Sequence, residues 1–480
     1  MKLSTAATTL SLLLVLPSPA QAQLEGEPFI HDPSTITLSD GKYYTFGTGR
    51  GGLVSKDGWT WHSGGERPGG GVAPDVIKIG DRYYVAYAVG GGGMSGGHAS
   101  DVKIMWTRSL DPASPDFGYH DVGTVASSDG LENVDAIDPA FLYANGRLWL
   151  SYGTYFGAIR MIELDPNTGA RVPGNKPVDV AIDMEATALM YRDGWYYLLG
   201  THGTCCDGPN STYHIRVGRS RDPLGPYVDH MGTPLLRGGG KMVVNARHRA
   251  IGPGHFGLID MGGGVEKFSM HYETDMNRGR SVLGIRPLLW KDGWPVAGEN
   301  LHEGTYEIES ERSGYALQLA TDFVRIDFDA RRSFFAAPGD PISPVADQTL
   351  AQDSASWGNG TLPVDMGDFM VRPHQLWSVA PANGAGGVMG TPYYKIVIAG
   401  TNRALAAARS GEVEVVPAFT GAAEQLWQID QLTDGTYRIM PKAVPGMTEP
   451  LALVAVGGST PSLVRFDPAS PAGRWTFKTP

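Results

Sequence analysis

Short apolar and aromatic runs alternate with tight polar turns along the first 300 residues of the chain. In four places an apolar run passes through a Gly, Asp or Asn turn into an aromatic-rich run: Ser39-Asp40-Gly41-Lys42-Tyr43-Tyr44, Ile79-Gly80-Asp81-Arg82-Tyr83-Tyr84, Ala144-Asn145-Gly146-Arg147-Leu148-Trp149 and Arg192-Asp193-Gly194-Trp195-Tyr196-Tyr197. Met261-Gly262-Gly263-Gly264-Val265-Glu266-Lys267-Phe268 is a degenerate fifth copy. Such turns supply the positive φ angles of β-hairpins. Five hairpins, about 40 to 70 residues apart, predict a five-bladed β-propeller. A β-sandwich is the alternative, but it does not require this self-similarity.

A different pattern begins near Leu301. Tyr306-Glu307-Ile308, Tyr394-Lys395-Ile396 and Tyr437-Arg438-Ile439 repeat one theme, and Gln375-Leu376-Trp377, Gln425-Leu426-Trp427 and Gly473-Arg474-Trp475 repeat another. Three similar units predict a β-trefoil in which each Trp packs in a shared core. Residues 336–367 are rich in Pro, Asp, Ser and Gly, which indicates a loop. We therefore expect an all-β protein with a propeller at residues 23–300 and a trefoil-like domain at residues 303–480.

Composition agrees with two β-rich domains. The chain has 480 residues, of which 42% are hydrophobic, with 65 Gly and 34 Pro, so short strands and turns are favoured over long helices. The net charge of −11 argues against a nucleic-acid partner, and a solvated acidic surface explains it.

The N-terminus has the features of an export signal. Lys2 is followed by a short apolar run at residues 6–16 and by Ala20-Gln21-Ala22, a small-residue cleavage site. We expect residues 1–22 to be removed and the protein to be secreted or periplasmic. The apolar run is too short to span a bilayer, and no later segment replaces it.

Cys205 and Cys206 are the only cysteines, and they are adjacent. They form either a disulfide between neighbours or two buried thiols, and export favours the disulfide.

Ionisable residues recur at one position of the repeated unit. Asp32, Asp138 and Glu185 each precede an aromatic residue of their own repeat by 11 positions, and His255 precedes Glu266 of the degenerate repeat by the same 11. Asp75 in the second repeat is out of step by about three residues. The innermost strand of each propeller blade begins near the central axis, so these side chains are expected to converge. Glycosidic bonds are cleaved by such paired carboxyl groups. Pro33 and Pro139 restrict the backbone of the preceding acids.

The segment from Pro28 to Pro295 resembles glycoside hydrolase family 43, most closely its endo-1,5-α-L-arabinanase branch. The matching stretches are His31-Asp32-Pro33-Ser34, Ala73-Pro74-Asp75-Val76, Ala136-Ile137-Asp138-Pro139, Met184-Glu185-Ala186, Cys205-Cys206-Asp207-Gly208, Asn210-Ser211-Thr212-Tyr213, Val217-Gly218-Arg219-Ser220, Gly252-Pro253-Gly254-His255 and Leu283-Gly284-Ile285-Arg286-Pro287. Their number and order make the resemblance specific.

The resemblance implies a role for each acid. Asp32 is the general base that activates water, Glu185 is the general acid, and Asp138 orients Glu185 and tunes its pKa. It also implies inversion of the anomeric configuration. His255 is similar to the histidine that holds a cation, usually calcium, on the propeller axis, mostly through water.

Further residues are expected to bind substrate or to support those that do: His31, Asp75, Cys205, Cys206, Tyr213 and Arg286. Two positions depart from the family pattern. Asp135 stands where Asn is usual, and Thr187 stands where Pro is usual. They leave the reaction type unchanged but open the question of substrate and of endo or exo action.

Residues 303–480 resemble ricin-type sugar-binding trefoils. This domain either binds sugar or forms a structural cap on the propeller. We expect a monomeric hydrolase of plant cell-wall arabinan or arabino-oligosaccharides. The alternatives are an exo-acting arabinofuranosidase or xylosidase of the same family, and a non-catalytic carbohydrate-binding protein.

Overall fold

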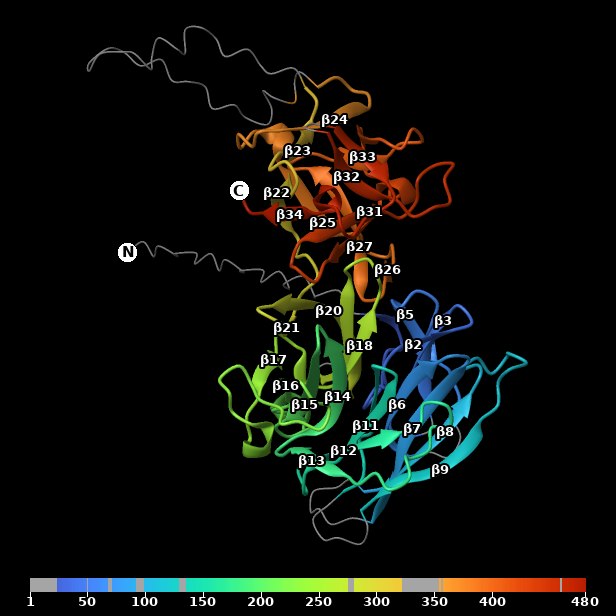
Figure 1. The fold of residues 1–480 in the computed structure, drawn as a ribbon. Helices are drawn as coiled ribbons and strands as arrows, with labels where there is room; N and C mark the ends of the chain where they lie inside the picture. Colours follow the sequence, from blue (N-terminus) through green and yellow to red (C-terminus); the bar gives the residue numbers. More distant parts are fainter. Residues whose placement is uncertain are drawn as a thin grey trace, which may run out of the picture.

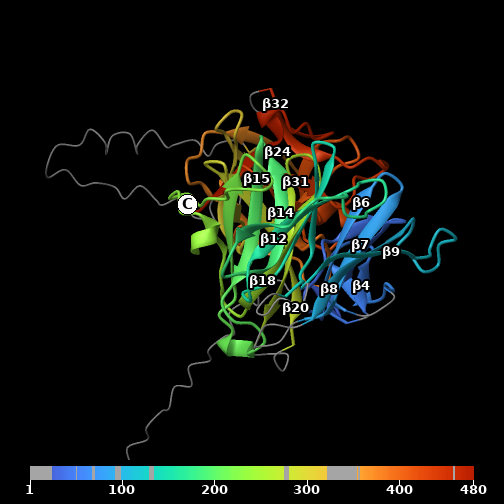
Figure 2. The ribbon, with the colours of Figure 1, turned by 60° about the horizontal axis from the view of Figure 1, so that its bottom comes forward.

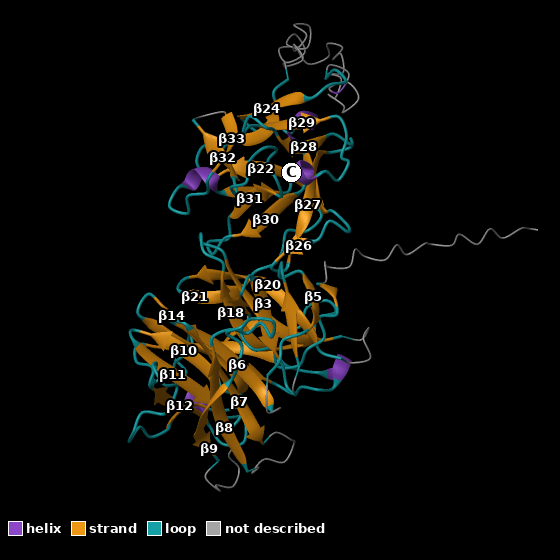
Figure 3. Ribbon diagram, turned by 90° about the vertical axis from the view of Figure 1, so that its right-hand side faces the viewer, coloured by secondary structure: helices purple, strands orange, loops and turns teal. Residues whose placement is uncertain are grey.

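The protein is described by a computed structural model that covers residues 24–49, 51–67, 71–91, 99–128, 135–274, 280–321, 354, 357–457 and 460–480. Most of these residues form strands and loops (Figure 3). Short 3-10 helices occur at η1 (Gly208–Asn210), η2 (Leu235–Arg237), η3 (Pro373–Gln375), η4 (Ala423–Gln425) and η5 (Pro471–Gly473). Within these ranges no helical segment has the length and apolar character needed to traverse a bilayer. The predicted signal peptide, residues 1–22, lies outside the described residues.

Five antiparallel sheets form the blades of a propeller (Figure 1). In chain order their strands are β2 (Thr37–Ser39), β3 (Lys42–Phe46), β4 (Gly52–Ser55) and β5 (Thr60–Ser63) in blade one; β6 (Val72–Ile79), β7 (Arg82–Gly90), β8 (Ser100–Thr107) and β9 (His120–Ser127) in blade two; β10 (Ala140–Ala144), β11 (Arg147–Tyr152), β12 (Ile159–Leu164) and β13 (Val178–Ala181) in blade three; β14 (Glu185–Arg192), β15 (Trp195–His202), β16 (His214–Ser220) and β17 (Lys241–Val244) in blade four; and β18 (Ile251–Asp260), β19 (Glu266–Glu273), β20 (Val282–Lys291) and β21 (Trp294–Ala297) in blade five. β1 (Glu25–Gly26) lies parallel to β5. The five predicted hairpins are therefore confirmed as blades, and the β-sandwich alternative is wrong.

The hairpin turns form as their residues predict. Asp40 and Gly41 have φ angles of 50° and 72°, and Asn145 and Gly146 have angles of 53° and 76°. Asp and Asn tolerate this left-handed conformation and Gly adopts it without cost, so the two-residue turn matches the twist of the strands it joins.

The ring closes between blade five and the start of the chain. Leu283 N–H donates to Pro28 O at 2.8 Å, and Ile30 N–H donates to Ser281 O at 3.2 Å. This pairing places the segment that contains His31 and Asp32 beside the beginning of β20. Figure 2 shows the ring from another side, with blades one and two in blue and blades four and five in green to yellow-green.

The C-terminal strands form a β-trefoil-like domain. They are β22 (Gly304–Ser310), β23 (Ala316–Leu319), β24 (Leu362–Gly367), β25 (Trp377–Pro381), β26 (Gly387–Val388), β27 (Thr391–Ile398), β28 (Ala404–Ala407), β29 (Val413–Val416), β30 (Trp427–Gln431), β31 (Tyr437–Pro441), β32 (Ala452–Val456), β33 (Thr460–Val464) and β34 (Trp475–Lys478). Part of the predicted loop at residues 336–367 is thus a strand, β24, which pairs with β23. Residues 336–353, 355 and 356 lie outside the described residues.

The three repeated tryptophans lie in one core, and each makes an equivalent hydrogen bond. Trp377, Trp427 and Trp475 are fully buried, and their Nε1 atoms donate to Leu317 O, Leu405 O and Leu453 O at 2.7, 3.0 and 2.8 Å. A buried indole needs such an acceptor. The repeat is therefore a core signature, as predicted.

The C-terminal domain contacts the propeller on the side away from the starts of the inner strands. Thr433 N–H donates to Gly264 O, in the turn that follows β18, and Gly390 N–H donates to Gly58 O. Met389, between β26 and β27, is fully buried in a cluster with Ile30, Leu53, Trp61, Ile259 and Ile285. In Figure 1 the β26–β27 hairpin reaches toward β18 and β20. The domain therefore packs across the junction of blades one and five.

Candidate active site

The ionisable residues of the common register converge where the inner strands begin. Asp32 precedes β2, Asp138 precedes β10, Glu185 starts β14, and His255 lies in the first half of β18. Asp32 and Asp138 both raise the pKa of Glu185 through their charge, so the three carboxyl groups share one electrostatic environment although they come from blades one, three and four.

The backbone is strained in the same way at this end of every blade. Asp32 and Asp138 have φ of 52°, His255 has 61°, Ala73 has 44° and Ala186 has 46°. Left-handed conformations of residues other than Gly cost about 1–3 kcal/mol each and cluster at functional sites. The five blades therefore meet at a point where backbone geometry is held against its own preference.

Asp32 sits among three histidines and one hydroxyl. Its Oδ1 lies 3.5 Å from His255 Nδ1, and its Oδ2 lies 3.5 Å from His31 Nε2 and accepts the Thr48 hydroxyl at 2.5 Å. Burial by itself would raise the pKa of Asp32. The hydrogen bond with His255 and the charges of the histidines outweigh burial and hold that pKa well below its usual range. Asp32 is therefore ionised at working pH.

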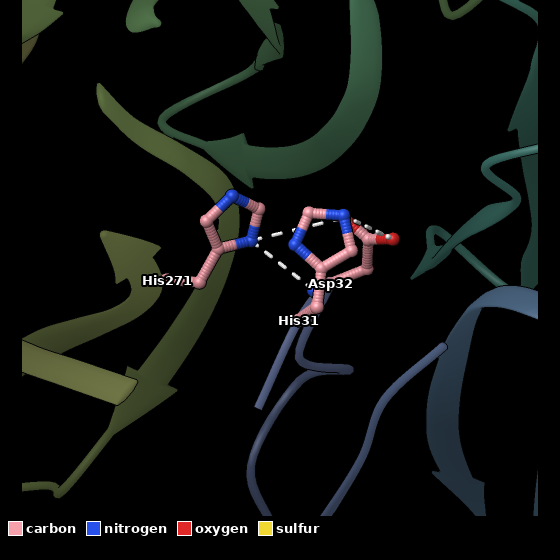
Figure 4. Close-up of side chains that lie close together, drawn as sticks. All are labelled: His31, Asp32 and His271. Carbon is pink, nitrogen blue, oxygen red and sulfur yellow. Dashed lines mark hydrogen bonds and ion pairs between the residues drawn. The ribbon is translucent and has the colours of Figure 1, made fainter. Parts of the chain in front are cut away.

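His271, at the end of β19, fixes the backbone of Asp32. The Asp32 N–H donates to His271 Nδ1 at 3.1 Å, and the imidazole is fully buried (Figure 4). Burial lowers the pKa of His271 to about 3, so the ring is neutral and its Nδ1 lone pair is free to accept. The rings of His31 and His271 lie 4.7 Å apart. His31, Asp32 and His271 have the spacing of a small metal site, but the Nδ1 of His271 is already used by the Asp32 backbone.

Asp138 is tied directly to the Glu185 strand. Its Oδ2 accepts the Ala186 N–H at 2.9 Å. Burial raises the pKa of Asp138, and the charge of Asp32 raises it further. Burial also raises the pKa of Glu185, with the charges of Asp138, Asp32 and Asp135 adding to the effect. Glu185 is therefore a carboxyl group that keeps its proton near neutral pH.

The two departures from the family pattern have structural consequences. Asp135 is buried, and its negative charge contributes to the raised pKa values of Asp138 and Glu185. A neutral Asn would not contribute in this way. Thr187 is buried, and its hydroxyl lies 2.9 Å from Ser151 Oγ, so it joins blades three and four.

The adjacent cysteines form a disulfide that lies against the site. Cys205 and Cys206 are bonded to each other, and Cys206 Sγ lies 3.9 Å from His31 Nε2. His31 also bonds Ser281 Oγ through Nδ1 at 3.0 Å. His31 thus stands between the disulfide and Asp32, with 35% of its side chain exposed. The disulfide therefore lies beside the surroundings of Asp32.

Two glycines of Gly252-Pro253-Gly254-His255 allow the disulfide loop to approach β18. A Cβ on Gly252 would lie 2.1 Å from Ser211 Oγ, and one on Gly254 would lie 2.7 Å from the Tyr213 ring. No side chain fits at either position, which gives a physical reason for this motif.

Three of the residues expected to bind or support substrate make other contacts in the structure. Asp75 is buried, and its two oxygens accept the Thr35 and Phe141 N–H groups at 3.1 and 2.9 Å, so it joins blades instead. Tyr213 is only 5% exposed and stacks on His271 at 6.1 Å, which makes it a support for that ring.

Arg286 is the third of these residues. Its guanidinium donates to Gly298 O at 3.0 and 3.1 Å and to Glu299 Oε1 at 3.3 Å. Both acceptors follow β21, in the connection to the C-terminal domain. Arg286 therefore holds that connection.

Sequence reasoning missed Thr48, His271 and Glu273. His271 and Glu273 alternate with the apolar Met270 and Tyr272 at the end of β19, and both are buried. A polar side chain in such a strand needs a partner, so this was the available signal.

Comparisons with known proteins agree with this geometry. Residues 26–295 match the profile of the family described as glycosyl hydrolases family 43, and residues 373–449 match a ricin-type β-trefoil lectin domain-like family. The chain is 30% identical over 323 residues to an extracellular endo-α-(1→5)-L-arabinanase of Bacillus subtilis, which covers 61% of this chain and 95% of that protein. It is 28% identical over 305 residues to an extracellular exo-α-(1→5)-L-arabinofuranosidase of Cellvibrio japonicus, with coverage of 56% and 86%.

Solved structures are similar in the same region. A crystal structure of an exo-1,5-α-L-arabinanase from a bovine ruminal metagenomic library aligns with a TM-score of 0.53 at 31% identity, over 58% of this chain and 100% of that one. An α-L-arabinanase of Cellvibrio cellulosa in complex with arabinohexaose aligns with a TM-score of 0.52 at 26% identity, over 56% and 95%.

Proposed function

The chain belongs to glycosyl hydrolases family 43, and from this premise we propose that it hydrolyses α-1,5-linked L-arabinofuranosyl bonds of arabinan with inversion and in an endo fashion. The related endo-arabinanase of Bacillus subtilis, most of which this chain covers, supports the choice of substrate.

One observation carries the proposal: the site drives the pKa values of two carboxyl groups in opposite directions. The histidines around Asp32 keep it ionised, and burial with neighbouring negative charge keeps Glu185 protonated. Glycoside hydrolysis by inversion needs this pair, one base and one acid. A carbohydrate-binding protein without catalysis does not need it.

In the proposed reaction Asp32 removes a proton from the attacking water. Thr48 and the histidines hold its carboxylate in one orientation, and His271 holds its backbone. Glu185 protonates the leaving oxygen. Asp138 maintains the position of Glu185 by binding the next backbone N–H, and its charge helps to keep the acid protonated.

We propose that His255 also helps to bind a cation, as the resemblance implies. The site fits this group, because His255 is buried, its Nδ1 lies 3.5 Å from Asp32 Oδ1, and the negative charges of Asp32, Asp138 and Asp75 surround it. Calcium there would be held mainly by water and would offset part of the negative charge.

An exo-acting enzyme is the second candidate. The Cellvibrio japonicus relative and the ruminal structure are both named as exo-acting and are as similar to this chain as the endo-acting relative. Two curated relatives are named extracellular, which supports our proposal that the protein is exported. The signal peptide, the domain limits and the monomeric state stay predictions.

The test is a product time course on linear arabinan with the wild type, Asp32→Asn and Glu185→Gln. We expect mixed oligosaccharides from the wild type at early times and a roughly 10²–10⁴-fold loss of rate in each variant. Arabinose alone from the outset would refute endo action. Unchanged hydrolysis by Asp32→Asn would refute its role as base.

A further inference from the structure

The disulfide loop belongs to blade four but is held by a residue of blade five. Glu273 is the last residue of β19 and is only 1% exposed. Its Oε1 accepts the Cys206 N–H at 2.8 Å, and its Oε2 accepts the Gly208 N–H at 2.5 Å. Both oxygens of one buried carboxylate therefore bind the turn that contains the disulfide.

The turn needs such a partner. Cys206 has a φ of 67° and Gly208 a φ of 54°, so two of its residues are in the left-handed region and one of them is not Gly. Successive backbone N–H groups in turns of this kind form a concave site for an anion. Hydrogen bonds to a carboxylate are stronger than those between neutral groups. Glu273 supplies the anion from within the protein.

The flanks of the loop are fixed separately. Thr204 N–H donates to Thr212 Oγ1 at 2.9 Å, Ser211 Oγ donates to Thr204 O at 2.9 Å, and Tyr155 OH donates to Gly203 O at 2.7 Å. These bonds secure the base of the loop. The position of its tip, with Cys206, depends on Glu273.

The tip is the part that faces the site. Cys206 is exposed, and its sulfur lies 3.9 Å from His31 Nε2, while the same nitrogen lies 3.5 Å from Asp32 Oδ2. A displaced tip would remove one side of the space beside His31. The disulfide sulfurs give a compact apolar surface that suits the C–H face of a furanose ring.

We propose that Glu273 is a positioning residue for substrate binding: by holding the Cys205–Gly208 turn through two N–H groups, it makes the disulfide and His31 one wall of the substrate groove. This inference rests on the proposed hydrolysis of arabinan. Glu273 touches neither the reacting bond nor the acids, so it acts on affinity and not on the chemical step.

The test compares Glu273→Gln with Glu266→Gln, a carboxylate on the same strand that binds Trp290 Nε1 at 2.6 Å at the far end of the blade. For arabino-oligosaccharide hydrolysis we expect KM to rise about tenfold in Glu273→Gln, with kcat within about twofold of wild type, because binding shared by ground and transition states is lost. Glu266→Gln should leave KM unchanged. Glu273→Asp, which keeps the charge but shortens the reach, should lie between, and it replaces Glu273→Gln if that variant does not fold.

A second measurement does not depend on substrate. The rate at which a phosphine reduces the Cys205–Cys206 disulfide, followed by thiol labelling, should increase in Glu273→Gln and stay at the wild-type value in Glu266→Gln. An unchanged KM together with an unchanged reduction rate in folded Glu273→Gln would overturn the proposal, as would a fall in kcat alone. A wild type inactive on arabinan would instead refute the proposed function, and the reduction rate would still decide whether Glu273 holds the turn.

Discussion

Replacing Asp430 by Asn is expected to destabilise the protein by about 3–5 kcal/mol, because it leaves a lysine ammonium buried between the two domains without its counter-charge. Lys267 of β19 and Asp430 of β30 are 2% and 1% exposed, and Lys267 Nζ lies 3.2 Å from Asp430 Oδ1. The same ammonium donates to Met389 O at 2.8 Å and to Thr391 Oγ1 at 2.7 Å. In Asp430→Asn these neutral acceptors remain, but the charge is no longer balanced.

Replacing the other partner of the ion pair is expected to cost less stability. Lys267→Met removes the buried ammonium itself, and Asp430 keeps Arg438 at 2.8 Å and Gln428 at 2.6 Å. The loss is then that of hydrogen bonds to neutral acceptors and to a carboxylate that is still paired, about 1–3 kcal/mol. The structure thus predicts an order, with Asp430→Asn worse than Lys267→Met.

Acid should weaken this contact. Burial raises the pKa of Asp430, but the charges of Lys267 and Arg438 more than offset it, so the pKa is below its usual range. A carboxyl group with a depressed folded-state pKa contributes stability above its unfolded pKa, and that stability is lost as the pH falls through the folded value. The difference between wild type and Asp430→Asn should therefore shrink in acid.

The assay is urea unfolding followed by tryptophan fluorescence at neutral pH, with the first transition compared if the domains unfold separately. Lys442→Met is the control, since Lys442 is an exposed lysine that binds Ala385 O, and it should change the free energy of unfolding by less than about 0.5 kcal/mol. A loss below about 1 kcal/mol for Asp430→Asn, or a larger loss for Lys267→Met, would refute the reasoning from the buried charge.

Three further predictions concern the catalytic face. Because the folded state raises the pKa of Glu185, the ionisation of Glu185 lowers stability as the pH rises above its ordinary pKa of 4.5. Glu185→Gln should therefore unfold at a higher temperature than wild type, by a margin that grows from about pH 5 to pH 8. A margin that does not change with pH would contradict this. Asp135→Asn removes a charge that raises the pKa of Glu185, so the alkaline limb of the kcat/KM profile should move to lower pH; a shift to higher pH would exclude this role. Gly252→Ala should lower the melting temperature and raise KM, since φ is 58° and the new Cβ would meet Ser211 Oγ at 2.1 Å; wild-type values for both would show that the loop adapts.

The local pattern of residues was sufficient for the fold and for the register of the site. Hairpin turns such as Asp40-Gly41 depend on the φ preferences of two neighbouring residues, so they can be predicted from the sequence. Because each blade repeats one unit, an equal spacing of 11 residues in four of the five repeats placed Asp32, Asp138, Glu185 and His255 at the same end of four inner strands. The three tryptophans of the second domain were identified in the same way.

What the side chains touch was decided by the tertiary structure. Asp75 and Arg286 lie in two of the motifs that match the family, but in the folded chain their side chains bind backbone groups of other segments. His31 and Ser281 are 250 positions apart, and Lys267 meets Thr391 at a separation of 124. Local periodicity encodes which face of a strand is buried, but not which distant segment covers it. His271, Glu273 and the contact between the two domains therefore became visible only when the ring of blades was closed.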